Sequence, residues 1–238
     1  MLRRDSPTGP VMIPDENGSL IAVGGKGPNG TRRKFLQVSA DQSVRWCSSY
    51  LKGDCGSRYL TNTARFQDGQ KRLIVTGERA EESPSRAKYA EFCVHVQDNR
   101  NGKKSKRYLD HWRAVHHRTE AEIWAIMQRH GVNPHPAYKI GDSRCSCAGC
   151  IFIANDNWAT LRFVAPAKFK RIAEYETEFG VTIHRTHNVT DRADAGEIMA
   201  NAKHYGPVAM NKEFLEPIIV PDDWKLPAGA FKANGGKF

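Results

Sequence analysis

The sequence predicts an α/β protein in which strand and helix patterns alternate. A short apolar run at residues 73–75 breaks at Gly77 into charged residues, and a helix start follows at Ser83. Two later segments, residues 119–130 and 166–179, have the apolar spacing of amphipathic helices. The 238 residues suffice for one domain with a substantial core, or for a domain with extensions.

The composition favours anionic partners and an intracellular location. Lys and Arg total 36 against 26 Asp and Glu, a formal net charge of +10, which suits nucleotides, nucleic acid, phosphate or sulfate groups. The sequence lacks a secretory signal and a run of about 18 apolar residues, so we expect a cytoplasmic protein without a membrane partner. The six cysteines should then be thiols, metal ligands or redox groups rather than disulfides.

Residues 1–34 are rich in Gly and Pro, which predicts an irregular N-terminal arm. Within it, residues 20–27 look like a strand that runs into a glycine-rich phosphate loop. Pro28, Asn29 and Gly30 follow where the helix of such a loop should begin. We therefore favour a plain turn over a phosphate cradle.

The junction at residues 73–86 reads as a buried strand, a loop and a helix N-terminus. Gly77 gives the backbone the conformational freedom to turn. Ser83 is a good N-cap, and Pro84 suits the first helical position. We expect the helix to continue to about Phe92. The N–H groups of a first helical turn can hold an anion at the carboxyl end of a strand.

Cationic side chains at this junction and upstream of it could add to an anion site or activate a thiol. Arg79 and Arg86 supply charged donors at the junction. Upstream, Cys47 follows a cation and an aromatic residue, with Lys52 further along the same segment, a setting that lowers a thiol pKa if the segment is helical. Simple packing of Cys47 into the core is the slightly favoured alternative.

A second cluster of candidate residues is the Cys-x-Cys-x-x-Cys arrangement of Cys145, Cys147 and Cys150. Three thiols with glycines around them can converge on zinc or an iron-sulfur cluster, with Cys47 or Cys55 as a fourth ligand. A redox or sulfur-carrying thiol pair and reduced packing cysteines are the alternatives.

The remaining segments predict less. The basic run at residues 99–107 favours a solvated turn over a nucleic-acid contact. Five histidines around the helix at 119–130 lack metal-ligand spacing and are expected to be structural or superficial: residues 111, 116, 117, 130 and 135. Residues 155–162 predict a short helix or turn, and residues 191–238 an irregular extension.

Together these motifs resemble the phosphoadenosine phosphosulfate (PAPS) reductase family, including its phage and DNA-phosphorothioation members. The resemblance covers about residues 31–185. It rests on Arg45-Trp-Cys-Ser with Lys52, Thr76-Gly-Glu-Arg-Ala-Glu-Glu-Ser with Arg86, Thr119-Glu-Ala-Glu-Ile-Trp124, and Asn133-Pro-His-Pro-Ala-Tyr leading to Arg144 and Cys147-Ala-Gly-Cys150. It implies an adenine-nucleotide-α-hydrolase-like fold over residues 35–190, a three-layer sandwich with a mostly parallel sheet.

The resemblance also implies site residues and ligands. The substrate would be an adenine nucleotide or PAPS, bound by Arg45, Lys52, Gly77, Arg79, Glu82, Ser83, Arg86 and Arg144. The thiols of Cys47, Cys147 and Cys150 would be catalytic, and an iron-sulfur cluster or zinc would use Cys47, Cys145, Cys147 and Cys150.

Two family motifs are absent from the sequence. The pyrophosphate loop, of the type Ser-Gly-Gly-x-Asp-Ser, is missing, so we expect the first strand, loop and helix to be lacking. The C-terminal Glu-Cys-Gly-Leu-His motif is missing too, so the thiol chemistry of thioredoxin-dependent reductases is not carried over.

Three functions are compatible with this pattern. The first is an enzyme of sulfur transfer or reduction that acts on an adenylylated or sulfonucleotide substrate, with the phosphate loop supplied by a partner chain. The second is a non-catalytic module that binds nucleic acid or protein, and the third a truncated remnant with an exposed core face. A homo-oligomer is compatible with each.

Overall fold

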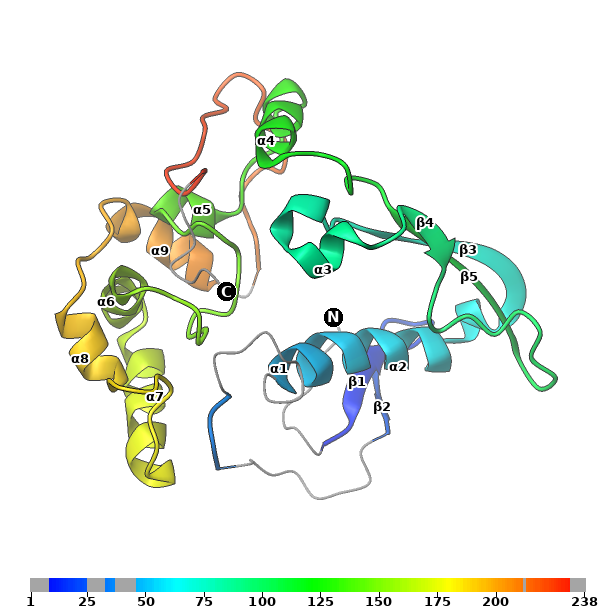
Figure 1. The fold of residues 1–238 in the computed structure, drawn as a ribbon, viewed down its shortest axis with the longest axis horizontal. Helices are drawn as coiled ribbons and strands as arrows, with labels where there is room; N and C mark the ends of the chain where they lie inside the picture. The colour runs from blue at the N-terminus through cyan, green and yellow to red at the C-terminus, as the bar shows by residue number, and fades with distance from the viewer. Residues whose placement is uncertain (1–8, 25–32, 37–45, 212, 232–238) are drawn as a thin grey trace. The chain divides into compact units, whose positions relative to one another are not determined.

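The computed structural model describes residues 9–24, 33–36, 46–211 and 213–231, which form two compact units. Unit 1 comprises Met1–Arg32 and Arg45–Thr119, and unit 2 comprises Arg33–Val44 and Glu120–Phe238. Helices occur in both units, and the strands in unit 1 make the chain a mixed α/β protein, as predicted (Figure 1). The predicted boundaries after residues 34 and 190 do not coincide with this division.

The first element of unit 1 is a β-hairpin inside the predicted irregular arm. Strand β1 (Val11–Pro14) pairs antiparallel with β2 (Leu20–Val23). Asp15 orders the turn, since its side chain accepts hydrogen bonds from the N–H groups of Asn17 and Ser19. The hairpin forms because Val11 and Ile13 alternate toward a buried cluster. The prediction of an irregular arm is therefore wrong for residues 11–23. Residues 25–30 of the glycine-rich run lie outside the described residues.

A long helical segment follows. It consists of α1 (Trp46–Ser48), a π-helical stretch η1 (Ser49–Gly53) and α2 (Asp54–Asn62), and the backbone stays helical at both junctions. A short 3-10 turn η2 (Ala64–Phe66) leads to the sheet. The helical arrangement expected for Cys47 and Lys52 is thus present.

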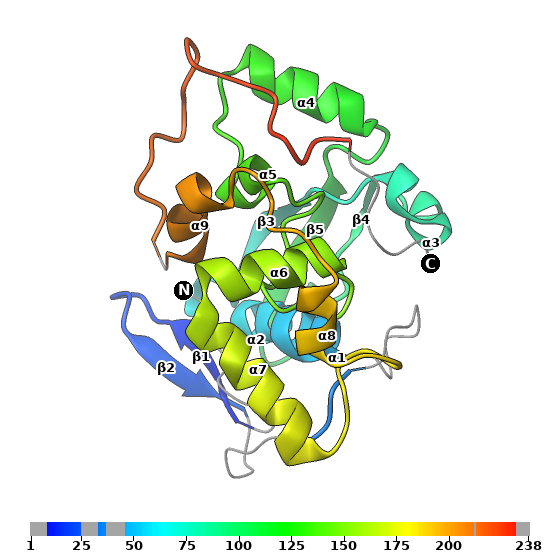
Figure 2. The same ribbon diagram turned by 90° about the vertical axis from the view of Figure 1, so that its left-hand side faces the viewer.

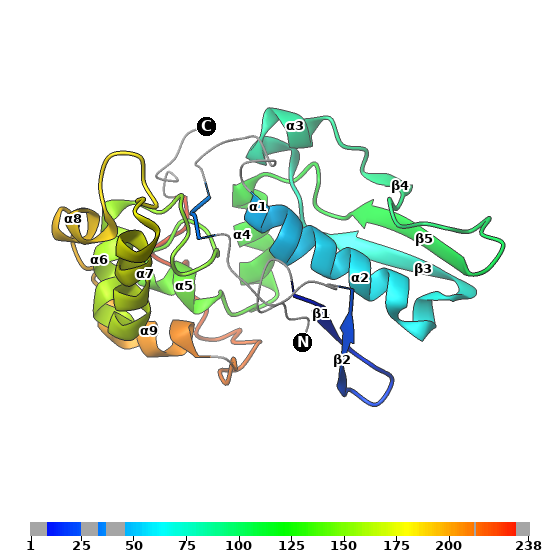
Figure 3. The same cartoon turned by 90° about the horizontal axis from the view of Figure 1, so that it is seen from below.

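The sheet of unit 1 has three strands in the order β3-β5-β4. Strand β3 (Asp68–Thr76) is parallel to β5 (Lys106–Arg113), and β4 (Phe92–Val94) is antiparallel to β5. The sheet therefore contains one parallel and one antiparallel strand pair, whereas the resemblance implies a mostly parallel sheet. Helices α1 and α2 lie along one side of this sheet (Figure 3).

The two faces of the sheet differ in burial. Ile74 and Leu109 pack with Leu60 and Phe66 on the α2 side. The alternate residues of β3, among them Leu73 and Val75, are exposed. The predicted strand at residues 73–75 is present, but the expectation that it is buried is wrong, because only one side of it is covered within the described part of unit 1.

The helix predicted after β3 is much shorter than expected. A 3-10 turn η3 (Ala80–Glu82) precedes α3 (Pro84–Ala87), and the chain is extended again in β4 from Phe92. Ser83 and Pro84 take the predicted N-cap and first-turn places, since the Ser83 side chain accepts from the Arg86 N–H. The extension to Phe92 is wrong because pairing of β4 with β5 requires extended backbone there.

Unit 2 is helical in its described residues. Its helices are α4 (Glu120–Arg129), α5 (Pro136–Ile140), α6 (Asn155–Val164), α7 (Pro166–Phe179), α8 (Val189–Asp194) and α9 (Ala202–Met210). Gly131 and Gly180 follow the two predicted amphipathic helices with positive φ. Helix α9 lies within the extension that was predicted to be irregular.

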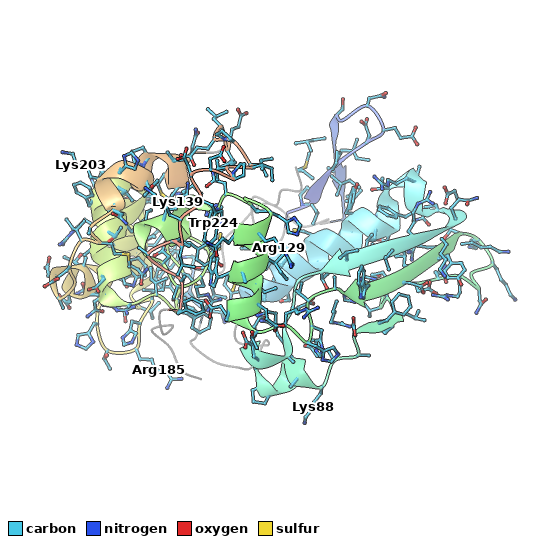
Figure 4. All side chains as sticks on the ribbon, turned by 90° about the horizontal axis from the view of Figure 1, so that it is seen from above. Lys88, Arg129, Lys139, Arg185, Lys203 and Trp224 are labelled. Carbon is cyan, nitrogen blue, oxygen red and sulfur yellow. The ribbon has the colours of Figure 1, made fainter. Side chains whose placement is uncertain are left out.

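The core of unit 2 surrounds Trp158 on α6, which is fully buried. Helices α7 and α8 supply its neighbours, among them Phe169 and Val189, and Figure 2 shows α8 beside α6. Residues 213–231 pass α4 and α5 as turns and irregular backbone, and there the Trp224 indole N–H donates to the carbonyl of Val132. Trp224 is labelled in Figure 4. Among the described helices we find none with the length and apolar character needed to cross a bilayer.

Candidate functional site

The carboxyl ends of the parallel strands β3 and β5 carry a group of charged and polar side chains, here called the strand-end cluster. Glu78 and Arg79 follow β3, Arg113 ends β5, and His116 lies in the turn after it. The Ala80 N–H donates to the carbonyl of His116 over 2.8 Å, which ties the two loops together. Strand pairing, and not nearness in the sequence, brings these residues to one place.

Four buried atoms of this cluster have no hydrogen-bond partner. They are Glu78 Oε2, Arg79 Nε, Arg113 Nε and His116 Nδ1. A buried polar group without a partner costs about 1–3 kcal/mol, so native proteins contain few of them. Their concentration at one edge of the sheet indicates a place where a polar ligand supplies the missing partners.

Arg113 is the most firmly placed cation of the cluster. Its Nη1 donates to the carbonyl of Ala90 over 2.7 Å and contacts the Cys93 sulfur at 3.5 Å. Its guanidinium lies 4.9 Å from the centre of the Tyr89 ring. The Nε is 4.0 Å from Glu78 Oε1, which is too long for a hydrogen bond. Arg113 can therefore offer a fixed donor to a ligand without moving.

Arg79 and His116 provide different hydrogen-bonding groups. Arg79 pairs through Nη2 with Glu81 at 3.0 Å and keeps Nε unpaired. The Nε2 of His116 is 2.9 Å from the carbonyl oxygen of Arg86, and because a carbonyl only accepts, Nε2 carries the proton. In the neutral ring, Nδ1 of His116 is then an acceptor. The cluster thus presents two unpaired donors and, with Glu78, two unpaired acceptors.

The electrostatics keep Glu78 ionised. Burial raises the pKa of its carboxyl, but hydrogen bonds from the Thr76 side chain and from backbone, together with Arg113, outweigh that effect, and the pKa is lower than usual. Burial, followed by the charge of Arg113, lowers the pKa of His111, whose Nε2 lies 2.7 Å from Thr76 Oγ1. At neutral pH the cluster therefore contains two guanidinium groups and one carboxylate, and the nearby His111 is neutral.

The predicted helix-terminus part of the site is weaker than the sequence suggests. Helix α3 has four residues, too few to build an appreciable dipole. Arg86 forms an ion pair with Glu82 through Nη1 and Oε2. Gly77 does not have positive φ, and a Cβ there would only touch Val115 at 4.0 Å, so the turn does not require glycine. Among the predicted residues at this junction, Arg79 belongs to the strand-end cluster, and its Nε is the unpaired atom.

Sequence reasoning missed three of the four cluster residues. No pattern in the sequence singles out Glu78 or Arg113, and His116 is expected to be structural or superficial. The available signal was the polar turn that follows the apolar and aromatic residues 106–112. Recognising that segment as a strand parallel to β3 would have placed Arg113 and His116 beside Glu78.

A second locus is a pocket within unit 2, here called the cysteine pocket. Its cavity volume is about 100 Å³, and it opens among α5, α6, α9 and the loop that carries the cysteines. Arg144 and Cys147 both line it, with Asp142 and Ser146 beside them. Much of the rest of the wall is apolar: Ala137, Ile140, Ala148, Phe152, Ile153, Leu161, Val164, Ala209 and Met210. The structure thus brings two predicted residues, Arg144 and Cys147, into one pocket.

The other cysteines of that loop lie outside the pocket lining. Cys145 is exposed and Cys150 is half-buried, and the Cys150 N–H donates to the carbonyl of Cys147 in a tight turn. Upstream, Cys47 belongs to unit 1 and is half-buried. Cys55 is buried, with its sulfur 3.5 Å from the Tyr50 carbonyl.

The proposed metal ligands do not form a ligand set within the described residues. In that part of the chain, we find no group of three or more His, Cys, Asp or Glu side chains that could hold a metal ion. Cys47 lies in unit 1, whereas Cys145, Cys147 and Cys150 lie in unit 2. A zinc or iron-sulfur site therefore stays a prediction, without support from these side chains. Lys52 is on η1 in unit 1, and Arg45 lies outside the described residues.

The basic loop at residues 99–107 is tied into the fold. Arg100 bonds to Asp98 and Asp110, and Arg107 donates to the carbonyl of Gln97 and to the side chain of Gln67. These contacts give the two arginines a structural role, which favours the predicted turn over a nucleic-acid contact.

Comparison with known proteins finds one region that is similar to a phage protein. No protein-family profile matches it, and no solved structure matches it. A region of 133 residues, 56% of the chain, is 30% identical to an uncharacterized 37.8 kDa protein in the gpa 5' region of Escherichia phage 186. The match spans 37% of that protein, so the chain corresponds to well under two thirds of its relative.

Proposed function

We propose that this protein binds an adenine nucleotide or sulfonucleotide such as PAPS at the strand-end cluster, as part of an enzyme of sulfur transfer or reduction. The observation that carries the proposal is the set of four unpartnered buried atoms at the carboxyl ends of β3 and β5. In open α/β sheets, ligands bind at that end of the strands. One of the motifs that resemble the PAPS reductase family, Thr76 to Ser83 with Arg86, falls on the same junction.

The donors and acceptors of the cluster fit a nucleotide better than a bare anion. The Nε groups of Arg79 and Arg113 can donate to phosphate or sulfate oxygens. Glu78 Oε2 and His116 Nδ1 can only accept, and they need hydroxyl or amino groups on the ligand. A nucleotide offers both kinds of group, whereas sulfate or pyrophosphate offers acceptors almost alone.

In this proposal Cys147 is the candidate thiol. It is exposed and lines a pocket of unit 2 that Arg144 also lines. The proposal also implies the finer fold of the resembling family, a three-layer sandwich with a mostly parallel sheet. The described sheet would need further strands for that, and a partner chain that carries the phosphate loop is the proposed source.

The proposal is tested by isothermal titration calorimetry with ATP, PAPS, adenosine phosphosulfate and inorganic sulfate. We expect nucleotide binding to the chain, alone or with a partner that supplies the phosphate loop, and much weaker binding of sulfate. Arg113→Ala should lower nucleotide affinity about tenfold or more, the value of one charge-assisted hydrogen bond. Arg171→Ala is the matched control, since Arg171 pairs only with exposed Glu174 and Tyr175 on α7.

The same titration separates the proposal from a binding module. Absence of binding by any nucleotide, with and without the partner, contradicts the proposal. So does an Arg113→Ala variant that binds like the wild type. Salt-sensitive DNA or RNA binding that persists in Arg79→Ala would instead indicate a non-catalytic nucleic-acid module.

A further inference from the structure

Cys93 on β4 lies at the polar end of the sheet face that α2 covers. The strand register pairs Cys93 with His111 and Thr76 with Arg113, so these four side chains lie on the same face of the sheet as buried Leu109. Thr76 Oγ1 is 2.7 Å from His111 Nε2. Toward the carboxyl ends of β3 and β5, this face therefore changes from apolar to polar.

Apolar packing does not account for Cys93. A free cysteine often behaves as a small apolar residue, and Cys55 does so, because it is buried in a cluster with Val11 and Ile13. Cys93 is half-buried, and it belongs to none of the hydrophobic clusters found in the described residues. In the described part of the chain, β4 is also a terminal strand of its sheet, so Cys93 lies at the margin of the sheet (Figure 3).

The sulfur of Cys93 shares Arg113 with the strand-end cluster. Arg113 Nη1 donates to Cys93 Sγ over 3.5 Å, and Nε of the same planar guanidinium is one of the four unpartnered buried atoms. His116 donates its N–H to the Arg113 carbonyl, is 3% exposed, and keeps Nδ1 without a partner. A group attached to the Cys93 sulfur would therefore lie against the donor that a ligand of the cluster needs.

We propose that Cys93 is a modification site for small disulfides that carry a carboxylate, such as glutathione disulfide, and that the resulting mixed disulfide closes the strand-end cluster to its ligand. The Cys93 sulfur bonds to one sulfur of the disulfide, the disulfide bond breaks, and the other half leaves as a thiol that takes the Cys93 proton. Cys93 is thereby oxidised and the leaving half is reduced. The inference rests on the proposed function, because it describes regulation of the same site.

The surroundings of Arg113 favour an anionic disulfide over a neutral one. Nη1 donates to the Ala90 carbonyl and to the Cys93 sulfur, and Nε stays 4.0 Å from Glu78 Oε1, so Arg113 has no hydrogen bond to this carboxylate. A carboxylate of the attached half can approach Nε closely and accept a charge-assisted hydrogen bond. Because the attached half and the ligand compete for Nε, each opposes the binding of the other.

The test treats the full chain with glutathione disulfide or with the neutral 2-hydroxyethyl disulfide. After the remaining thiols are blocked, mass spectrometry of tryptic peptides measures the rate at each cysteine, and the peptide of residues 89–100 contains Cys93 alone. We expect Cys93 to prefer glutathione disulfide about tenfold or more over the neutral disulfide, relative to the same ratio in the urea-unfolded chain. Buried Cys55 should react with neither reagent before unfolding.

Three variants locate the effect. Arg113→Ala should remove the preference for glutathione disulfide, whereas Arg171→Ala, on α7 in unit 2, should keep it. Modification of the wild type should lower its affinity for ATP or PAPS about tenfold or more, and Cys93→Ser should keep its affinity after the same treatment. Circular dichroism checks that the variants are folded. Slower modification of Cys93 in the presence of ATP or PAPS measures the same competition in the wild type, without a substitution.

Each outcome decides the inference. If Cys93 reacts no faster than Cys55, or if Arg113→Ala keeps the preference for glutathione disulfide, the inference is overturned. Modification of Cys93 that leaves nucleotide affinity unchanged overturns it as well. If neither ATP nor PAPS binds, but the preference depends on Arg113 and modification abolishes pyrophosphate binding, the modification site stands and the proposed function fails.

Discussion

Glu78 and Arg113 face each other across the ends of two parallel strands, with Oε1 of the carboxylate 4.0 Å from Nε of the guanidinium. Each group keeps one buried atom without a partner. The pair is thus close enough for mutual electrostatic attraction and too far apart for a hydrogen bond. A ligand that inserts here would supply the missing hydrogen-bond partners of both groups.

Glu78→Gln should raise the affinity for inorganic pyrophosphate several-fold. The carboxylate is ionised, because its pKa is lower than usual, and its charge repels a bare anion that approaches Arg79 and Arg113. Isothermal titration calorimetry at low salt measures the effect. Glu174→Gln, in an exposed ion pair on α7, should change nothing. An unchanged pyrophosphate affinity in Glu78→Gln would show that Glu78 does not border the anion site.

Acid should weaken unit 1 through Asp98. Its pKa is lowered to about 2, first by the hydrogen bond from the Arg100 side chain and also by the N–H groups of Leu109 and Arg100, although burial acts in the opposite direction. A carboxyl in the unfolded chain titrates near pH 4, roughly. The stabilisation is therefore complete above about pH 4 and is lost as the pH falls toward about 2.

Urea unfolding at a series of pH values measures this loss. In Asp98→Asn the free energy of unfolding should be lower at neutral pH and should depend less on pH between about 4 and 2. If the variant keeps the steep pH dependence of the wild type, other carboxyl groups are responsible.

Gly229→Ala should destabilise unit 2 and disturb the cysteine pocket. A Cβ at residue 229 would lie 2.0 Å from the carbonyl oxygen of Asp142, which lines that pocket. The backbone must shift, because Gly229 also donates its N–H to the Tyr138 carbonyl. We expect a cost of about 1–3 kcal/mol in the free energy of unfolding, as for other overpacked sites.

Gly56→Ala provides the contrast to that variant. Gly56 lies inside α2, and a Cβ there would meet no atom within 4 Å. Alanine in a helix interior should raise the free energy of unfolding by up to about 1 kcal/mol. Chemical denaturation of both variants checks the pair, and equal effects would show that the close contact at Gly229 is absent.

Trp158→Ala should unfold or nearly unfold unit 2. Trp158 is fully buried at the centre of its core, and truncation of such a side chain costs about 3–5 kcal/mol. Trp158→Phe should cost clearly less, because the phenyl ring keeps much of the buried volume, whereas the unpartnered indole N–H is removed in both variants. Denaturation followed by circular dichroism compares the two, and equal losses would contradict the central place of this ring in the core.

Thiol alkylation should separate the cysteines into fast and slow groups. Cys145 and Cys147 are exposed and should react with N-ethylmaleimide in the native protein, whereas buried Cys55 should react only after unfolding. Mass spectrometry of tryptic peptides measures each rate. Cys147→Ser should remove one of the two fast sites, and rapid native labelling of Cys55 would contradict its burial.

Several local features follow from short-range sequence patterns. Ser83 caps α3, Gly131 and Gly180 end two amphipathic helices, and residues 73–75 form a strand, because capping, chain reversal and β-branching act over a few residues. The anion-favouring charge and the candidates Arg79, Arg144 and Cys147 also came from the sequence. The resemblance to PAPS reductases stays a prediction.

The tertiary structure decided what depends on strand pairing and on packing between distant segments. The sequence by itself determined that a charged loop follows a strand, but only the parallel pairing of β3 with β5 placed Arg113 and His116 beside Glu78 and Arg79. The tertiary structure also shows that the side chains of Leu73 and Val75 are exposed, since burial depends on which elements lie over a face of the sheet. Hydrophobic residues specify that a face should be buried, whereas the partner that buries it is a matter of long-range contacts, which local patterns do not encode.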